Sequence, residues 1–258
     1  MNLPLSELKE FLDEKSVLYN KPKFIDSDPI SIPHQFSKKQ DIEISGFLSA
    51  TIAWGNRKSI IKNDQKLVDW MDNSPHDYIT NATDSDLAVF RKFVHRTFNG
   101  DDCQFFIYAL QQLYKKHESL ETVFSTDKND DELDTSNFIC SFRKAFFSPS
   151  HLPRTEKHVS NPLKGSSSKR LNMMLRWFCR HDTNGVDFGI WNKIKPNQLV
   201  CPLDVHTGNV GRKLGLLKRK QNDWKAAIEL TNNLKKLDPI DPIKYDFALF
   251  GLGVFEKF

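Results

Sequence analysis

The sequence lacks the features of a membrane or secreted protein. No run of about 18 or more apolar residues occurs in the 258-residue chain, so no segment is expected to cross a bilayer as a helix. The first residues are followed by Glu7, Glu10 and Asp13, whereas a signal peptide begins with a basic and then an apolar segment. We therefore expect a cytoplasmic protein with no membrane partner.

Cysteine motifs for metals are also missing. The chain has four cysteines, and no two of them form a CxxC or CxxxxC pair: Cys103, Cys140, Cys179 and Cys201. Neither a zinc ribbon nor a cysteine-ligated iron–sulfur cluster is supported by this spacing. We expect reduced cysteines, no metal and no cofactor.

Glycine is scarce and strand patterns are weak. The chain has 11 glycines, and segments with the apolar period of a helix dominate it. Its length suffices for one large domain or two modest ones, each with a real core. We predict an all-α protein with at least eight helices.

Apolar periodicity and capping residues predict where the helices lie. The predicted helices cover 3–20 (capped at Ser6), 40–53, 57–71, 85–93, 103–117 (capped by Asp101 and Asp102), 135–147, 168–180, a helix after Asp204, a helix that is capped by residues 222–224 and runs to 236, and a terminal helix with Asp241 as its N-cap and Pro242 at its first position. The helix 40–53 is almost entirely apolar and is predicted to cross the centre of a domain. Residues 21–33, with three prolines, are predicted to be extended or loop, 126–135 a solvated acidic turn, and 182–200 an irregular connection.

Positive charge is concentrated in one window. The whole chain has a net charge of +4. Between positions 143 and 180, nine basic residues face one acid, Glu156, which gives 9 − 1 = +8: Arg143, Lys144, Arg154, Lys157, Lys164, Lys169, Arg170, Arg176 and Arg180. The last four are expected to point largely outward from the helix 168–180. Such a density suggests a polyanion partner, phosphates first; a solvated basic face is the alternative.

Asp204 has the surroundings of a helix N-cap. Pro202 precedes it, and Val210, Leu214 and Leu217 fall on one face of the following helix. A carboxylate at this position is fixed in direction and is favoured as the anion by the helix dipole. It can also be a cap and nothing more.

Lys169 lies in the first turn of a helix that follows a glycine turn. Gly165 and three serines precede it, and free amides at a helix N-terminus can hold a phosphate. A lysine beside the positive end of a helix and other cations loses its proton more easily, so it can act as an amine nucleophile. Most lysines in such places only bind phosphate or solvent.

Three segments resemble helix-hairpin-helix DNA glycosylases of the endonuclease III type. Leu163, Gly165 and Lys169 match the leucine, first glycine and catalytic lysine of the hairpin Leu-Pro-Gly-x-Gly-x-Lys. Asp204 and His206 match the family's Val-Asp-x-His motif, and the segment 46–51 resembles its Leu-Leu-Ser-x-Gln helix. The order of the three segments agrees, over roughly residues 45–215.

The sequence also departs from that family. Lys164 replaces the hairpin proline, Ser167 replaces its second glycine, and the family's C-terminal four-cysteine loop is absent. Lys169 and Asp204 are 204 − 169 = 35 residues apart, a longer spacing than in endonuclease III-like enzymes and similar to that of archaeal 8-oxoguanine glycosylases. The segment 238–253 is similar to an uncharacterised bacterial branch of the superfamily.

The resemblance implies a fold and a set of roles. It implies two helical subdomains, about 40–147 and 1–39 plus about 148–258, with a central cleft. Lys169 would attack the sugar and Asp204 would stabilise the sugar cation. Candidates for the base pocket, each of which could instead be structural, are Trp54, His95, Phe98, Trp177, Trp191 and His206. Candidates for contacts with the DNA backbone are Arg57, Lys58, Lys164, Gly165, Ser166, Ser167, Ser168 and Arg170.

The leading hypothesis is therefore a DNA base-excision repair glycosylase with abasic-site lyase activity. Its partner would be double-stranded DNA with a damaged base such as 8-oxoguanine, and we expect a monomer associated with the nucleoid. A non-catalytic helical DNA-binding protein on the same scaffold is the alternative. A metal-dependent phosphohydrolase, prompted by His95, His181, Asp182 and Asp204, would need a further His and Asp at helical spacing, which we do not find.

Overall fold

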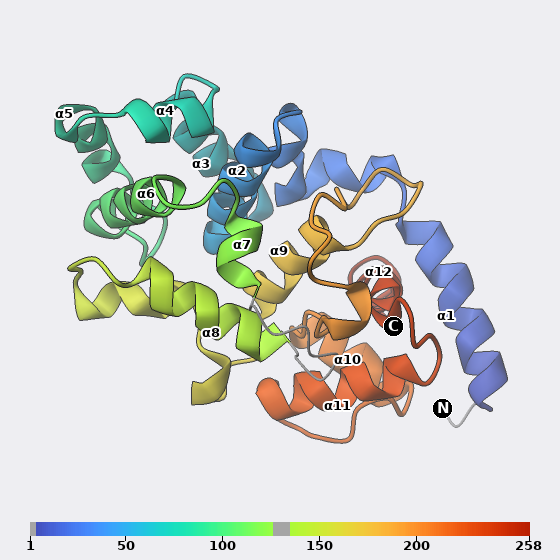
Figure 1. The fold of residues 1–258 in the computed structure, drawn as a ribbon. Helices are drawn as coiled ribbons and strands as arrows, with labels where there is room; N and C mark the ends of the chain where they lie inside the picture. Colours follow the sequence, from blue (N-terminus) through green and yellow to red (C-terminus); the bar gives the residue numbers. More distant parts are fainter. Residues whose placement is uncertain (1–3, 126–134) are drawn as a thin grey trace. The chain divides into compact units, whose positions relative to one another are not determined.

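The computed structural model of the protein describes residues 4–125 and 135–258, and most of these residues are helical (Figure 1). They form twelve α-helices and eight short 3₁₀ helices, with two isolated β-bridges and no strand. The predicted all-α class is confirmed. No helix in these residues is long and apolar enough to cross a membrane. The predicted acidic turn lies outside the described residues, apart from its last position.

The chain divides into two compact units. Among the described residues, the middle unit contains 25–125 and 137–160, and the C-terminal unit contains 4–24, 135–136 and 161–258. Each unit is described by itself below.

The middle unit is organised around helix α2 (Lys39–Ile52), with every residue from Ile42 to Ile52 buried. The Phe47 ring lies 5.7 Å from that of Phe106 in α6 and 5.1 and 5.3 Å from those of Phe142 and Phe146 in α8. Its helices are η2 (Pro29–Ser31), η3 (Pro33–Gln35), α2, α3 (Arg57–Asp69), α4 (Pro75–Asn81), α5 (Asp84–Leu87), η4 (Ala88–Lys92), α6 (Gly100–Tyr114), α7 (Leu120–Phe124), α8 (Thr135–Phe146, from residue 137) and η5 (Pro153–His158). The prediction that this apolar helix crosses a domain centre is confirmed.

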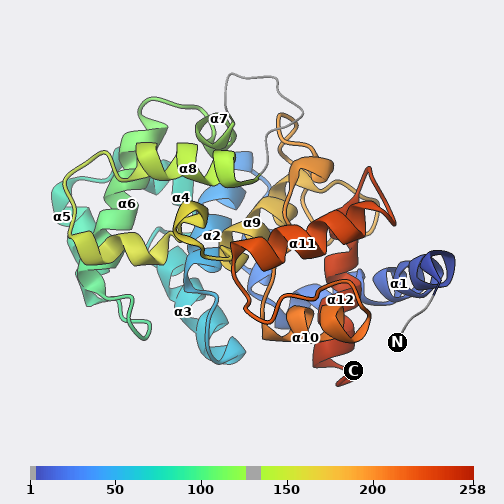
Figure 2. The ribbon, with the colours of Figure 1, turned by 90° about the horizontal axis from the view of Figure 1, so that it is seen from below.

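In the C-terminal unit, helix α12 packs against both α1 and α10 (Figures 1 and 2). Two glycines allow this close approach. A Cβ at Gly251 would lie 2.1 Å from Cδ2 of Tyr19, and one at Gly253 would lie 2.9 Å from Cβ of His206. The helices are α1 (Leu5–Tyr19), η1 (Pro22–Ser27, which ends in the middle unit), η6 (Pro162–Lys164), α9 (Lys169–Cys179), η7 (Pro196–Gln198), α10 (Val205–Lys213), α11 (Trp224–Lys235), η8 (Pro242–Lys244) and α12 (Tyr245–Val254).

Several predicted helix ends were wrong. Pro4, not Ser6, precedes α1, and no side chain caps that helix. Asn99, not Asp101 or Asp102, caps α6: its side chain accepts a hydrogen bond from the Asp102 amide. The Asp102 carboxylate accepts one from the Asn99 amide, and the two bonds form a capping box. Asp241 is the N-cap residue and Pro242 starts the helix, as predicted, but Asp241 makes no capping bond and the helix that begins there is the 3₁₀ helix η8. The proline-rich segment after α1 is neither extended nor loop, because its prolines start the successive 3₁₀ helices η1 to η3.

The prediction that Arg176 and Arg180 point outward was wrong. Both are buried, because α9 is surrounded by protein over residues 171–179. Asp187 lies 3.1 Å from each of the two guanidinium groups. Asp246 lies 2.5 Å from Arg176, and Asp241 lies 2.9 Å from Arg180. These two cations therefore belong to a buried ion-pair network and do not contribute to an exposed basic face.

Candidate active site

Lys169 is the first residue of α9, after a tight turn. The side chain of Asn161 accepts a hydrogen bond from the Leu163 amide and starts η6, and Gly165 then takes the left-handed conformation with φ 84°. Ser168, immediately before Lys169, is also left-handed, with φ 50°. A single 3₁₀ turn, η6, therefore precedes the left-handed residues that lead into α9.

The turn is tied to two other parts of the C-terminal unit. The Trp224 amide, at the start of α11, donates to the Gly165 carbonyl at 3.0 Å. The Ser167 hydroxyl donates to the Leu203 carbonyl at 3.3 Å, one residue before Asp204. The segment that carries Lys169 is therefore linked directly to the segment that carries Asp204.

Asp204 is the N-cap of α10, as predicted. Its Oδ1 accepts a hydrogen bond from the Thr207 amide at 3.0 Å. Its main-chain carbonyl accepts a second bond, from Asn222 Nδ2, at 3.0 Å. The first bond fixes the direction of the carboxylate and leaves Oδ2 available for another group.

Oδ2 of Asp204 lies 3.9 Å from Nζ of Lys169. The two side chains are 25% and 27% exposed, so each can be reached from solvent. Nζ also lies 3.6 Å from the sulfur of Met173, one turn along α9. The fold thus brings together two groups 35 residues apart, and both belong to the C-terminal unit.

Asp246 of α12 is a residue of this site that our sequence reasoning missed. It is buried, and its Oδ2 accepts a hydrogen bond from Arg176. Burial raises the pKa of Asp246 to about 6; the positive charges of Arg176 and Lys169 oppose that shift, and the negative charge of Asp204 adds to it. One signal was present, since Asp246 is the single charged residue in the apolar helix 245–254.

Cys201 lies in the same surroundings. Its thiol is buried, and burial raises its pKa well above the ordinary value. The charges of Asp246, Arg176 and Asp204 act on it as well. Because the thiolate is the nucleophilic form, we assign Cys201 to the core rather than to the chemistry.

Trp54 and His95, two of the six base-pocket candidates, are in contact in the middle unit. The Trp54 ring lies 5.1 Å from that of His95, edge to face, and 6.0 Å from that of His158, with which it is stacked. His95 is buried and contacts Asn63 and the Trp54 carbonyl at 2.8 and 3.2 Å. His158 contacts the buried Asp102 at 3.2 Å. Trp54 itself is half-buried.

The other four base-pocket candidates are divided between core and surface. Phe98, in the middle unit, and Trp177 and Trp191, in the C-terminal unit, are completely enclosed. They stabilise the two cores, since a large enclosed aromatic side chain contributes chiefly by burial. His206 is exposed on the first turn of α10, two residues after Asp204.

The backbone-contact candidates also lie in both units. Arg57 is half-buried and Lys58 is exposed at the start of α3 in the middle unit. In the C-terminal unit, Lys164 and Gly165 are exposed, Ser166, Ser167 and Arg170 are half-buried, and Ser168 is buried. Burial lowers the pKa of Arg170 to about 10, which leaves it a cation at neutral pH.

A family model decides where this chain belongs. The model described as "Protein of unknown function (DUF2400)" matches residues 28–255. The chain belongs to that family. No curated protein and no solved structure matches it. The residues of this DUF2400 chain that the family model matches include Lys169, Asp204 and Asp246.

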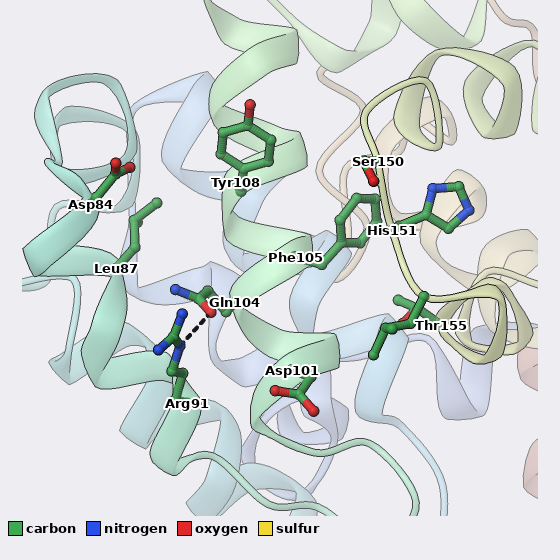
Figure 3. A pocket seen from close by; sticks show the side chains of 11 residues that line it. Asp84, Leu87, Arg91, Asp101, Gln104, Phe105, Tyr108, Ser150, His151 and Thr155 are labelled. Atoms are coloured by element: carbon green, nitrogen blue, oxygen red, sulfur yellow. Dashed lines mark hydrogen bonds between the residues drawn. The ribbon is translucent and has the colours of Figure 1, made fainter.

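A cavity of about 500 Å³ in the middle unit contains none of the predicted catalytic residues (Figure 3). Phe105 and Tyr108 of α6 line it, and Arg91 on the opposite side donates to Gln104 at 2.7 Å. His151 lies near the Phe105 ring, with 5.2 Å between the ring centres. We therefore place the candidate chemistry at Lys169 and Asp204 rather than in this cavity.

The hypothesis of a metal-dependent phosphohydrolase requires a set of metal ligands, and residues 4–125 and 135–258 contain none. No group of three or more His, Cys, Asp or Glu side chains there could hold a metal ion. Asp182 forms an ion pair with Arg180 and accepts a hydrogen bond from Asn20 at 2.7 Å.

Proposed function

We propose that this protein is a DNA glycosylase with abasic-site lyase activity, which removes a damaged base from duplex DNA. The observation that carries the proposal is the 3.9 Å approach of Lys169 Nζ to Asp204 Oδ2 at the starts of two helices. The amine supplies a nucleophile, and the capped carboxylate supplies a negative charge of fixed direction. The order of the sequence motifs supports the same roles.

The chemistry needs both groups. In its neutral form, Nζ of Lys169 forms a bond to C1′ while the bond from C1′ to the base breaks, and the base leaves with that electron pair and takes up a proton. Asp204 stabilises the positive charge that develops on the sugar. The nitrogen then loses its two protons as the bond from C1′ to the ring oxygen O4′ breaks; O4′ keeps that electron pair and takes up one proton, and an imine between Nζ and C1′ results.

Strand cleavage follows from the imine. Loss of a proton from C2′ and departure of the phosphate from C3′ constitute β-elimination, and water then releases Lys169 from the sugar. Asp204 Oδ2 is the nearby acceptor for the protons that the amine gives up, because Oδ1 is held by the cap. The target base must leave the stack before any of these steps.

The surroundings of Lys169 suit a polyanion. Lys164 and Gly165 are exposed in the turn that precedes α9, and Lys169 lies at the N-terminus of this 11-residue helix. Free amides at a helix N-terminus and neighbouring lysines favour phosphate groups. As the substrate we propose duplex DNA with an oxidised purine such as 8-oxoguanine, bound by a monomer in the cytoplasm at the nucleoid.

Trapping with borohydride tests the proposal. The protein is incubated with duplexes that contain 8-oxoguanine, uracil or an abasic site, and borohydride reduces any imine to a stable adduct. We expect an adduct with the wild type and none with Lys169→Gln. Lys236→Gln, which changes an exposed lysine at the far end of α11, is the control and should keep the adduct.

Two results would overturn the proposal. One is an adduct that persists at full yield in Lys169→Gln. The other is a wild type that excises no base from any duplex and forms no adduct. Duplex binding that depends on salt and survives Lys169→Ala and Asp204→Asn, without turnover in the wild type, would support the non-catalytic DNA-binding protein instead.

A further inference from the structure

Helix α3 of the middle unit carries a row of exposed lysines. Lys58, Lys62 and Lys66 recur every four residues, so they lie on one face of the helix, and all three are exposed. Their side chains line a hollow of about 800 Å³ on the surface of the unit. With a rise of about 1.5 Å per residue, the row is about 12 Å long. The middle unit therefore presents three ammonium groups in line along a rigid element.

Carboxylates do not neutralise this row. Within residues 4–125 and 135–258, none of the three lysines forms an ion pair, and Nζ of Lys66 lies 4.5 Å from the ring centre of Trp70. The helix contains two acids. Asp64 is buried on the opposite face, and burial raises its pKa well above the ordinary value, which favours the uncharged form. Asp69 is exposed at the last position of the helix. The exposed face of α3 is therefore positive.

A fourth cation, Arg96, lies beside the loop that leads into α3. A Cβ at Gly55 would lie 2.9 Å from Nη1 of Arg96, so the glycine leaves room for the guanidinium. His95 and Phe98 exchange main-chain hydrogen bonds of 2.8 and 3.0 Å, which hold the turn that carries Arg96. Arg96 is exposed and, in the described part of the chain, forms no ion pair. The first turn of α3 contains no acid, so a bound anion would offset cations at the positive end of this helix.

We propose that Lys58, Lys62, Lys66 and Arg96 bind the phosphate backbone of duplex DNA, as a contact separate from the site at Lys169 and Asp204. The inference rests on the proposed function only for the choice of DNA as the partner. Each strand of B-DNA presents one phosphate per 3.4 Å or so of its axis, which gives about three or four along a row of about 12 Å. Every lysine of the row can thus reach a phosphate with its flexible side chain.

The exposed face of α3 fits DNA better than an anionic membrane. A helix that lies on a membrane inserts large apolar side chains between the lipids. No large apolar side chain of α3 is exposed. The charges of α3 can therefore meet phosphates at a surface, but the helix has no apolar group to insert.

The salt dependence of duplex binding tests this contact. Fluorescence anisotropy follows the binding of a labelled, undamaged duplex from about 50 to about 200 mM salt, and the logarithm of the binding constant falls linearly with that of the salt concentration, by about 0.9 per phosphate neutralised. In the triple variant Lys58→Gln, Lys62→Gln and Lys66→Gln, the slope should be less steep by about 2–3. The affinity at about 0.1 M salt should fall at least about 10-fold. Arg96→Gln alone should reduce the slope by about 1.

A second triple variant is the matched control. Lys115→Gln, Lys116→Gln and Lys144→Gln remove the same charge from exposed lysines of the middle unit, at the end of α6 and on α8. Glutamine forms helices about as well as lysine, so both triple variants should fold, which circular dichroism checks. The control should keep the slope of the wild type.

The outcomes separate this contact from the proposed function. A slope that is unchanged in the α3 variant overturns the contact, and so does an equal change in the control, because overall charge would then be the cause. Wild-type binding to vesicles of phosphatidylserine and phosphatidylcholine, without binding to the duplex, also overturns it. A borohydride adduct together with an unchanged slope overturns this inference alone. No adduct, together with a change confined to the α3 variant, overturns the catalytic proposal alone.

Discussion

Substitutions of Asp204 separate its two roles, as a helix cap and as a catalytic carboxylate. Asparagine caps helices about as well as aspartate, so Asp204→Asn should keep the bond to the Thr207 amide. It removes the charge at the helix N-terminus, which costs about 0.3–1 kcal/mol. Asp204→Ala also removes the cap bond and should lower the free energy of unfolding by about 1–2 kcal/mol in all.

Activity should follow a different order. Both variants lack the anion 3.9 Å from Lys169 Nζ, so both should lose transition-state stabilisation. Removing one such electrostatic group costs about 100- to 1,000-fold in rate. We therefore expect single-turnover excision to fall at least about 100-fold in Asp204→Asn, although its stability changes by less than about 1 kcal/mol.

Two measurements on the same samples check this prediction. Urea unfolding followed by circular dichroism gives the stability, and single-turnover excision gives the rate of the chemical step. Thr83→Ala is the control, because Thr83 caps the exposed helix α5 in the middle unit; it should lose about 0.5–1 kcal/mol of stability and keep full activity. Wild-type excision by folded Asp204→Asn would refute the catalytic role and leave Asp204 a cap.

Three further predictions concern stability. Arg180→Met removes the cation that pairs with Asp187 and Asp241 in the network, and should lower the free energy of unfolding in urea by about 3–5 kcal/mol. Gly165→Ala should cost about 1–2 kcal/mol by the same assay, from the φ of 84° alone, because nothing lies within 4 Å of the added Cβ. The third concerns pH and Asp246, whose pKa burial raises from 3.8 to about 6. Between these two pH values the folded state holds a proton that the unfolded state has released, so this carboxyl makes folding less favourable as pH rises. We compare the free energy of unfolding of the wild type with that of Asp246→Asn at each pH. The wild-type value minus the variant value should fall by on the order of 2–3 kcal/mol from pH 4 to pH 7.

Each of these has a contrary result. A loss below about 1 kcal/mol in Arg180→Met would mean that the network is open to solvent. An unchanged stability in Gly165→Ala would mean that the turn has another conformation in solution. A stability difference that is constant with pH, or rises with it, would mean that Asp246 is ionised throughout this range.

Helices with a capping residue and a clear apolar period could be predicted from the sequence. Asp204, Asp223 and Asn56 each cap the helix that was expected to follow. The side chains of Arg176 and Arg180 could not be placed, because each has one carboxylate partner far away in sequence: Asp246 is 70 residues from Arg176, and Asp241 is 61 residues from Arg180. An arginine on a helix is normally read as exposed, and only the tertiary packing shows otherwise.

The site was predictable in part, for a similar reason. Local motifs identified Lys169 and Asp204, while the distance between them depends on how the turn at Gly165 and the start of α10 are held together. Large aromatic residues line pockets and fill cores alike, so sequence could not separate Trp54, which is half-buried, from Trp177, which is enclosed. Asp246 comes 246 − 204 = 42 residues after Asp204 and has no motif of its own.

The identity of the amine that joins the DNA tests the catalytic role of Lys169 most directly. The borohydride adduct with an abasic-site duplex can be digested and the modified peptide sequenced by mass spectrometry. We predict that the modification lies on Lys169, whose Nζ is 3.9 Å from Asp204. A modification on Lys164, an exposed lysine of the same turn, or the absence of any adduct would contradict the account.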